Sequence, residues 1–295
     1  MNIYLAGTYA LGAEPWLGGI LFSPKGSVGG ASPQYEEGAS ASACVHSGDA
    51  QFQRQLRSAR WPRGGVDHLL ANRVNLLESF YYLDTWQVEN LHHFKRFMLD
   101  SGGFTLAISK RGALDEKELN SYIARYAEFV ATNDNVRLWF EMDIDHVKGT
   151  DWVKRTTAWL ERETGKIPIS VWHPCRGAKG FEEMCERYPY VAIGTTDIRK
   201  QLAKSVRWFT DTAHRYGSKI HGLGYTKLAG LERTGFDSVD STAWLYGNRG
   251  GFVYEFTGTS LAKHKAPPGK RLIARDAARH NFREWVRFSE YMETR

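Results

Sequence analysis

The sequence predicts an α/β fold of the (β/α)8 barrel type, forming a single domain over residues 1–295 with its core at about 60–260. Short apolar runs that end in an acid or a glycine alternate with amphipathic stretches at a spacing of roughly 20 to 40 residues. Parallel strands need crossover connections, which such stretches supply as helices. Roughly eight units follow one another without an obvious linker, and the chain length suits one large barrel. A doubly wound sheet is the alternative that this spacing leaves open.

The N-terminal part has no sustained periodicity. Residues 12–50 are rich in Gly, Ser and Ala, which predicts irregular structure. Helical patterns follow at 75–82 and 88–96, and residues 96–100 form a short apolar run that predicts a strand ending at Asp100. It is the first predicted strand whose last residue is an acid.

The remaining elements alternate regularly. Helices are expected over 115–132, 152–164, 182–187, 198–216 and 227–234, with a basic C-terminal helix over 272–293. Strands are expected over 136–143, 167–173, 190–194, 219–224 and 238–240. In a barrel, the carboxyl ends of the strands form the face where active sites lie. The residues expected on that face are Asp100, Asp143, His173, Gly194, Gly222 and Asp240.

Composition narrows the class of protein. With 42% hydrophobic and 24% charged residues the chain is typical of a folded protein, and its net charge of +6 favours a polyanionic partner. Cys44, Cys175 and Cys185 show no CxxC spacing, so we expect no disulfide framework and no cysteine-rich zinc site, as in a reducing cytoplasm. No apolar run approaches the length of a membrane span, and the first residues lack a signal-peptide pattern. We therefore expect neither a secreted nor a membrane protein.

Two acidic motifs carry the chemistry. Residues 99–104 read LDSGGF and residues 235–241 read GFDSVDS, so each places a carboxylate where a strand gives way to a turn. Two acids that face one pocket can divide the duties of nucleophile and acid/base, which indicates glycosyl transfer. Asp237 is the alternative nucleophile to Asp240, and Asp145 is the alternative to Asp143. The histidines His92, His93, His214 and His221 lack metal-ligand spacing and are expected to be surface or core residues.

These motifs, in this order, resemble those of the tRNA-guanine transglycosylases. Residues 100–104 resemble the DSGGF motif of that family, and residues 235–241, followed by RGG at 249–251, resemble its G-x-D-x-x-D-C segment with a later Arg-x-Gly. Between them, AIG at 192–194 and GLG at 222–224 occur in the order of the family's base-pocket turns. The resemblance covers most of residues 97–251, and HN at 280–281 is similar to a family pair.

The resemblance implies a role for each matching residue. Asp240 would attack C1′ of a nucleotide to form a covalent glycosyl-enzyme intermediate, and Asp100 would protonate the departing guanine and later accept a proton from the incoming base. Asp143 would accept hydrogen bonds from the Watson–Crick edge of the base, and Phe104 would stack on its face. The remaining base-binding positions are Ser101, His173, which stands where the family usually has Gln, Ile193, Gly194, Gly222 and Gly224.

Two departures from the family change the expected substrate. Since the chain has no cysteine beyond Cys185, it lacks the CxCxxC…H zinc site of the tRNA enzymes, and the family's P-T-R is replaced by TAW at 242–244. The chain is most similar to the zinc-free phage and bacterial enzymes that insert 7-deazaguanines into DNA. The implied partners are DNA and a base such as preQ0, with no metal and no cofactor, in the cytoplasm (the host's, if the chain is phage-encoded). A tRNA enzyme, a hydrolytic N-glycosidase, a non-catalytic nucleic-acid-binding barrel and a homodimer stay open.

A basic segment near the C-terminus is expected to contact phosphates. Between Lys263 and Arg287 there are eight Lys or Arg against Asp276 and Glu284. The predicted nucleic-acid contacts are Arg249, Lys263, Lys265, Lys270, Arg271 and Arg275. The alternative is the solvated face of a helix whose apolar stripe is Phe282, Trp285, Val286 and Tyr291. The expected stacking platforms are Trp244, Tyr246 and Tyr254.

Overall fold

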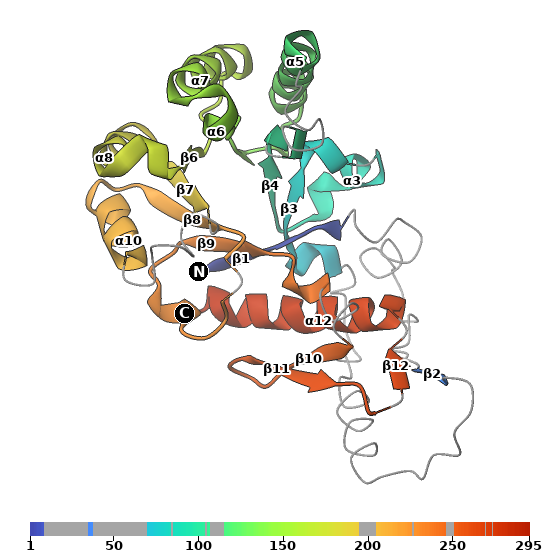
Figure 1. Ribbon diagram of the computed structural model, residues 1–295. Helices are drawn as coiled ribbons and strands as arrows, with labels where there is room; N and C mark the ends of the chain where they lie inside the picture. Colours follow the sequence, from blue (N-terminus) through green and yellow to red (C-terminus); the bar gives the residue numbers. More distant parts are fainter. Residues whose placement is uncertain are drawn as a thin grey trace. The chain divides into compact units, whose positions relative to one another are not determined.

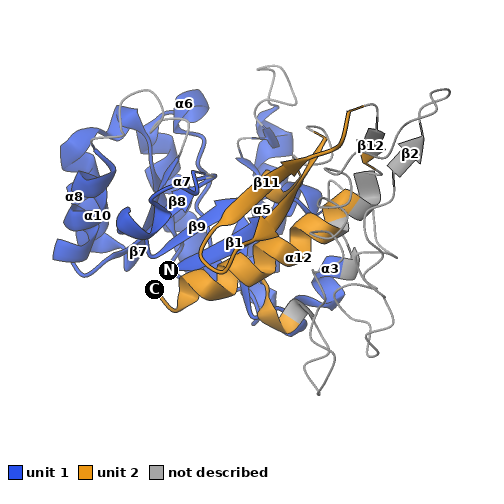
Figure 2. Cartoon of the chain, turned by 90° about the horizontal axis from the view of Figure 1, so that it is seen from below, with its two compact units in different colours: residues 1–9, 75–241 blue, residues 10–74, 242–295 orange. Residues whose placement is uncertain are grey.

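The computed structural model describes residues 1–8, 35–37, 70–83, 85–103, 105–106, 115–194, 205–225, 227–245, 251–268, 270–272 and 274–295. The chain divides into two compact units, coloured in Figure 2. Unit 1 comprises residues 1–9 and 75–241, and unit 2 comprises residues 10–74 and 242–295. The single-domain organisation expected from the sequence stays a prediction.

Unit 1 is built on an eight-stranded parallel sheet with the order β5-β4-β3-β1-β9-β8-β7-β6. Its strands are β1 (Asn2–Ala6), β3 (Asn75–Ser79), β4 (Arg96–Asp100), β5 (Leu138–Trp139), β6 (Ser170–Trp172), β7 (Tyr190–Gly194), β8 (Lys219–Leu223) and β9 (Ser238–Ser241). The sheet curls (Figure 1), and an isolated parallel bridge joins Phe140, directly after β5, to Ile169, directly before β6. The fold class is therefore α/β with a curled, barrel-like parallel sheet.

Helices lie along the outer side of this sheet (Figure 1). The α-helices of unit 1 among the described residues are α3 (Thr85–Glu89), α5 (Glu116–Thr132), α6 (Asp145–Lys148), α7 (Thr150–Thr164), α8 (Gly177–Arg187) and α10 (Val206–Arg215). Short 3-10 turns are η3 (Phe80–Tyr82), η4 (Leu91–His93), η5 (Pro174–Arg176) and η6 (Leu231–Arg233). Asp115 caps α5 because its carboxylate accepts a hydrogen bond from the backbone N–H of Lys117 at 3.1 Å.

The inside of the curled sheet is filled by one hydrophobic cluster. Its members come from six strands or their immediate flanks: Tyr4, Ala6, Leu77, Met98, Phe140, Ile169, Val171 and Ala192. Alternate residues of a strand face the same side. Asp100, two residues after Met98 on β4, therefore points to the inner side at the carboxyl end of its strand.

Unit 2 contains the long helix α12 (Ala274–Glu293) and two short antiparallel pairs. One is the hairpin of β10 (Phe252–Phe256) with β11 (Leu261–Lys265), and the other is β12 (Lys270–Leu272) with β2 (Tyr35–Glu37). The 3-10 turn η2 (Leu70–Arg73) also belongs to this unit. Helix α12 buries Trp285 and Phe282, whose rings contact Tyr254 at 5.5 Å and Trp244 at 5.0 Å between centroids. Within the described parts of the chain, no helix is both long and apolar enough to cross a bilayer.

Several predicted elements are confirmed. Strands β4 and β7 have the predicted bounds, and α5, α7, β8, β9 and α12 agree with prediction to within about two residues. Helix α8 starts five residues before the predicted start, and β6 covers only residues 170–172 of its predicted range. The region predicted as a helix over 198–216 is described only from residue 205, where α10 is observed.

Three predictions of helix are wrong. Residues 75–79 are strand β3, whose five residues are all buried, followed by the turn η3. A central strand buried on both faces has no alternation, so periodicity cannot distinguish it from a buried helix. The stretch 88–96 forms only the end of α3 and the turn η4, and 227–234 forms only η6, which follows Gly230 in the left-handed region at φ +75°. For the same reason of complete burial, strand β1 is not evident from the sequence.

Candidate functional site

The two acids singled out from the sequence lie at the same edge of the unit 1 sheet. Asp100 ends β4 and Asp240 lies near the end of β9, with β3 and β1 between these strands. Tyr4, which belongs to the inner cluster, pairs with Asp240 in register, so Asp240 also faces the inner side. The negative charge of Asp240 contributes to the raised pKa of Asp100, so the two carboxylates interact electrostatically.

The turn after Asp100 is shaped by Gly102. This glycine has φ +70°, and a Cβ atom there would lie 2.7 Å from Ser79 Oγ, Tyr122 OH and Tyr81 Cβ. The Tyr122 hydroxyl donates to the carbonyl of Ser101 at 2.6 Å and fixes the turn to helix α5. The backbone N–H groups of Ser101 and Gly102 in this turn donate hydrogen bonds to the Asp100 carboxylate.

Asp100 has the electrostatics of a proton carrier. Its pKa is raised to about 6: burial is the largest cause, the charge of Asp240 adds to the rise, and the hydrogen bond from the Gly102 N–H opposes it. A carboxyl group with such a pKa is available in both protonation states near neutral pH. Its environment therefore suits a general acid that later acts as a base.

Asp240 is held by two hydrogen bonds that end on one oxygen. Its Oδ1 accepts from the backbone N–H of Gly224 at 2.5 Å and lies 3.2 Å from Nε2 of His221. The side chain is nearly buried, with 6% of the residue exposed. Among the described residues, both hydrogen-bond partners of this carboxylate contact Oδ1. The other oxygen, Oδ2, is therefore the one available to a ligand.

Asp143 lies beside Asp100, as the sequence predicts, but not at the end of an extended strand. Strand β5 ends at Trp139, and residues 141–144 continue without regular structure. The Asp143 carboxylate is 3.4 Å from Ser101 Oγ, and its pKa lies well above the usual range because of burial and the charges of Asp100 and Glu141. The predicted strand is longer than the observed one because an apolar run continues past the last paired residue.

The alternative acids occupy other environments. Asp237 precedes β9 and so lies at the opposite, amino end of the strands, where it accepts from the Ile220 N–H at 2.8 Å and contacts His214 at 3.0 Å. Asp145 is buried in a bidentate ion pair with Arg176, at 2.7 and 2.9 Å. Asp237 therefore cannot be the nucleophile at the carboxyl end of the strands, and Asp145 is engaged by Arg176 and is not available to bind a base there.

The predicted base-pocket residues lie at the ends of neighbouring strands. Ile193 is fully buried and Gly194 ends β7, while Gly222 packs against the ring of Phe236, where a Cβ atom would approach the ring to 3.0 Å. His173 directly follows β6 and is half-buried, with its ring 6.4 Å from that of His146. These positions belong to the same sheet edge as Asp100 and Asp240.

No protein-family model matches this chain, and no curated protein matches it. The interpretation of the site therefore depends on the ordered motifs and on the geometry of these residues.

Two buried polar residues were missed by sequence reasoning. Glu78, on the strand next to Asp100, accepts hydrogen bonds from the N–H and hydroxyl of Thr8, the former at 2.7 Å, and burial raises its pKa to about 7. His221 was expected to be a surface or core histidine; it is fully buried and contacts the candidate nucleophile. Its position inside a predicted strand, directly before the GLG turn at 222–224, was the available signal.

The predicted nucleic-acid contacts have mixed outcomes. Phe104, Arg249 and Tyr246 lie outside the described residues, as do the side chains of Lys270, Arg271 and Arg275. Lys263 and Lys265 are exposed on β11, and the Lys263 ammonium lies 4.9 Å from the centroid of the Phe252 ring. The prediction that Trp244 and Tyr254 are stacking platforms is wrong. Their exposed fractions are 0% and 2%, so neither ring presents a face on which a base could stack. Aromatic residues near a motif are more often used to fill a core.

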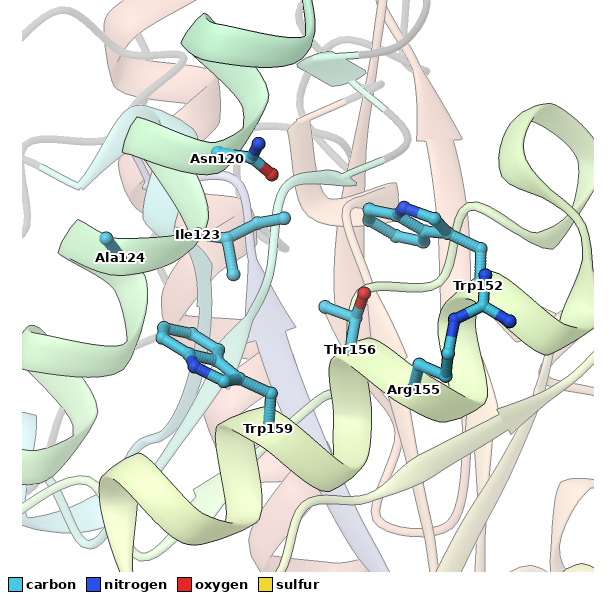
Figure 3. A pocket seen from close by; sticks show the side chains of 7 residues that line it. All are labelled: Asn120, Ile123, Ala124, Trp152, Arg155, Thr156 and Trp159. Carbon is cyan, nitrogen blue, oxygen red and sulfur yellow. The ribbon is translucent and has the colours of Figure 1, made fainter.

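Two pockets of unit 1 lie away from the candidate acids. One, of about 350 Å³, is formed by α5 and α7, where the indoles of Trp152 and Trp159 extend toward Ile123 (Figure 3). Another, of about 450 Å³, lies along α7 and α8 and has Glu141 and Arg176 among its lining residues. Among the described residues, no group of three or more His, Cys, Asp or Glu is arranged to hold a metal ion.

Proposed function

We propose that this chain is a transglycosylase that replaces guanine in DNA with a 7-deazaguanine base such as preQ0. The observation that carries the proposal is the pair of carboxyl groups at one sheet edge. Asp240 is oriented through one oxygen, and Asp100 has its pKa raised to about 6 by burial and by the charge of Asp240. Two interacting acids in different environments can take different roles.

The proposed reaction is a double displacement. Asp240 Oδ2 attacks C1′ of the target nucleotide, the C1′–N9 bond breaks with its electron pair going to the guanine, and Asp100 gives its proton to the departing base. The incoming 7-deazaguanine then passes a proton to Asp100 and attacks C1′. The ester bond to Asp240 breaks and its electron pair returns to the carboxylate, so that two inversions retain the configuration.

Base recognition follows from the groups beside the two acids. Asp143 accepts hydrogen bonds from the Watson–Crick edge, and the Ser101 hydroxyl at 3.4 Å orients it. Backbone groups at Ile193, Gly194 and the 222–224 turn approach the base from the neighbouring strands, and Phe104 stacks on its face. The target base leaves the duplex to reach them, at a cost of a few kcal/mol that binding must offset.

We infer that the curled sheet is a (β/α)8 barrel. Eight parallel strands and the bridge between Phe140 and Ile169 support this closure, and both acids then lie on the barrel face typical of active sites. DNA rather than tRNA is favoured because the zinc cysteines and the P-T-R segment are missing from the sequence. Exposed Lys263 and Lys265 on β11 serve as phosphate contacts in this proposal.

The test is incorporation of labelled preQ0 into guanine-containing duplex DNA, with tRNA in a parallel reaction. We expect incorporation into DNA and a denaturation-resistant protein–DNA adduct, both lost by about 10⁴-fold or more in Asp240→Asn. Asp237→Asn, three residues away at the opposite strand end, is the matched control and should retain both.

Each alternative gives a different result in the same experiment. Incorporation into tRNA alone would identify a tRNA enzyme, and release of guanine without replacement would identify a hydrolytic N-glycosidase. Binding of DNA with neither adduct nor exchange, unchanged in Asp240→Asn, would leave a nucleic-acid-binding barrel. Any of these results refutes the proposal of base exchange in DNA.

A further inference from the structure

We propose that His221 is a positioning residue that orients the nucleophile Asp240 through a buried hydrogen-bond chain running from Tyr190 through Ser238. This inference rests on the proposed function, because it assigns His221 a part in the attack by Asp240. It concerns three side chains that the resemblance to a known family does not assign.

The register of the sheet brings these side chains together. His221 on β8 pairs with Ser238 on β9, and Ser238 and Asp240 face the same side because they are two residues apart. The His221 ring is completely buried between Tyr4 and Phe140, with ring centroids 6.0 and 5.6 Å away. This packing holds the imidazole in one orientation.

The hydrogen bonds form an unbroken chain. Tyr190 OH lies 2.5 Å from Ser238 Oγ, Ser238 Oγ contacts His221 Nδ1, and His221 Nε2 lies 3.2 Å from Asp240 Oδ1. An ionised carboxylate can only accept, so Nε2 carries a proton and donates it to Oδ1. In the neutral imidazole Nδ1 then accepts from the Ser238 hydroxyl, whose oxygen accepts from Tyr190.

This series of hydrogen bonds fixes the orientation of the Asp240 carboxylate. With Nε2 of His221 and the N–H of Gly224 both on Oδ1, the carboxylate cannot rotate without losing two donors, and Oδ2 is the oxygen presented to C1′. A misplacement of about 1 Å in a reacting group can cost about 100-fold in rate. The His221 contact should therefore affect the attack more than the binding of DNA.

The test compares two substitutions of the same histidine. His221→Phe keeps a buried ring but removes the donor, whereas His221→Gln keeps an N–H donor near the position of Nε2. We expect His221→Phe to slow adduct formation by about 100-fold with KM for DNA changed by less than about twofold, and His221→Gln to recover most of that loss. His214→Phe is the matched control, because His214 pairs with Asp237 at 3.0 Å on the surface.

A measurement that needs no substrate accompanies the kinetics. The ¹⁵N NMR spectrum of the imidazole in the unmodified chain should show a protonated Nε2 at His221, and an unprotonated Nε2 would refute the chain of donors. If the wild-type chain exchanges bases and His221→Phe, folded, forms the adduct at the wild-type rate, the positioning role is wrong and the proposed function stands. If the wild-type chain forms no adduct on DNA or tRNA, both are wrong.

Discussion

Replacing Gly102 by alanine should destabilise the protein much more than the same change at a comparable glycine. Gly102 forms the turn that directs backbone N–H groups to Asp100, and its φ of +70° disfavours a side chain. Gly165, which ends α7, has a similar φ of +66°, but a Cβ atom there would meet nothing within 4 Å. Both variants therefore carry the same backbone strain, about 1–2 kcal/mol.

The difference between the two variants comes from the contacts. At Gly102 the new methyl group would lie 2.7 Å from each of Ser79 Oγ, Tyr122 OH and Tyr81 Cβ. Forcing such a group into a packed site costs about 1–3 kcal/mol beyond the strain. We therefore expect Gly102→Ala to lower the free energy of unfolding by about 2–5 kcal/mol and Gly165→Ala by about 1–2 kcal/mol.

The assay is urea denaturation of both variants and the wild type, followed by tryptophan fluorescence, with the slope of the transition compared between them. Equal losses in Gly102→Ala and Gly165→Ala, within about 0.5 kcal/mol, would show that the close packing around the turn is not real. The same result would remove the structural reason for a glycine at this point of the LDSGGF motif.

Three further predictions concern buried groups whose environments are equally well defined. Glu78→Gln should flatten the pH dependence of stability, because the pKa of Glu78 is raised from 4.5 to about 7 on folding. The wild type should therefore lose on the order of 3 kcal/mol of unfolding free energy from this group as the pH rises from 4.5 to 7. Urea denaturation at a series of pH values in which both proteins lose the same stability would contradict this. Arg176→Ala should lower the free energy of unfolding by about 3–5 kcal/mol, because it leaves the buried carboxylates of Glu141 and Asp145 without a cation. The control Arg215→Ala removes an exposed pair with Glu182, at 3.4 Å, and should lower it by less than about 1 kcal/mol in the same assay. Asn281→Ala should cost about 2–4 kcal/mol, because the N–H of Tyr254 and the carbonyl of Trp244 lose their partner in unit 2, and a melting temperature equal to that of the wild type would refute this.

The candidate site shows why the two acids were predictable from the sequence. A carboxylate at the carboxyl end of a predicted strand is a local pattern, and in parallel sheets all such positions reach the same edge. Asp100 and Asp240 could therefore be placed at one edge without knowing which strands are neighbours. The structure separates Asp240 from Asp237, because Asp237 precedes β9 at the amino end of the strands whereas Asp240 lies near the carboxyl end of β9.

Sequence alone also determined the α/β class, most of the alternating elements and the approximate bounds of the amphipathic helices, because their periodicity is written in consecutive residues. Strands β1 and β3 were decided by tertiary structure: they are buried on both faces, so they show no alternation. The burial of Trp244 and Tyr254 and the raised pKa values of Asp100 and Glu78 depend on residues far away in the chain. The chain from Tyr190 to Asp240 is the clearest case, since only the register of three strands joins side chains that the sequence separates.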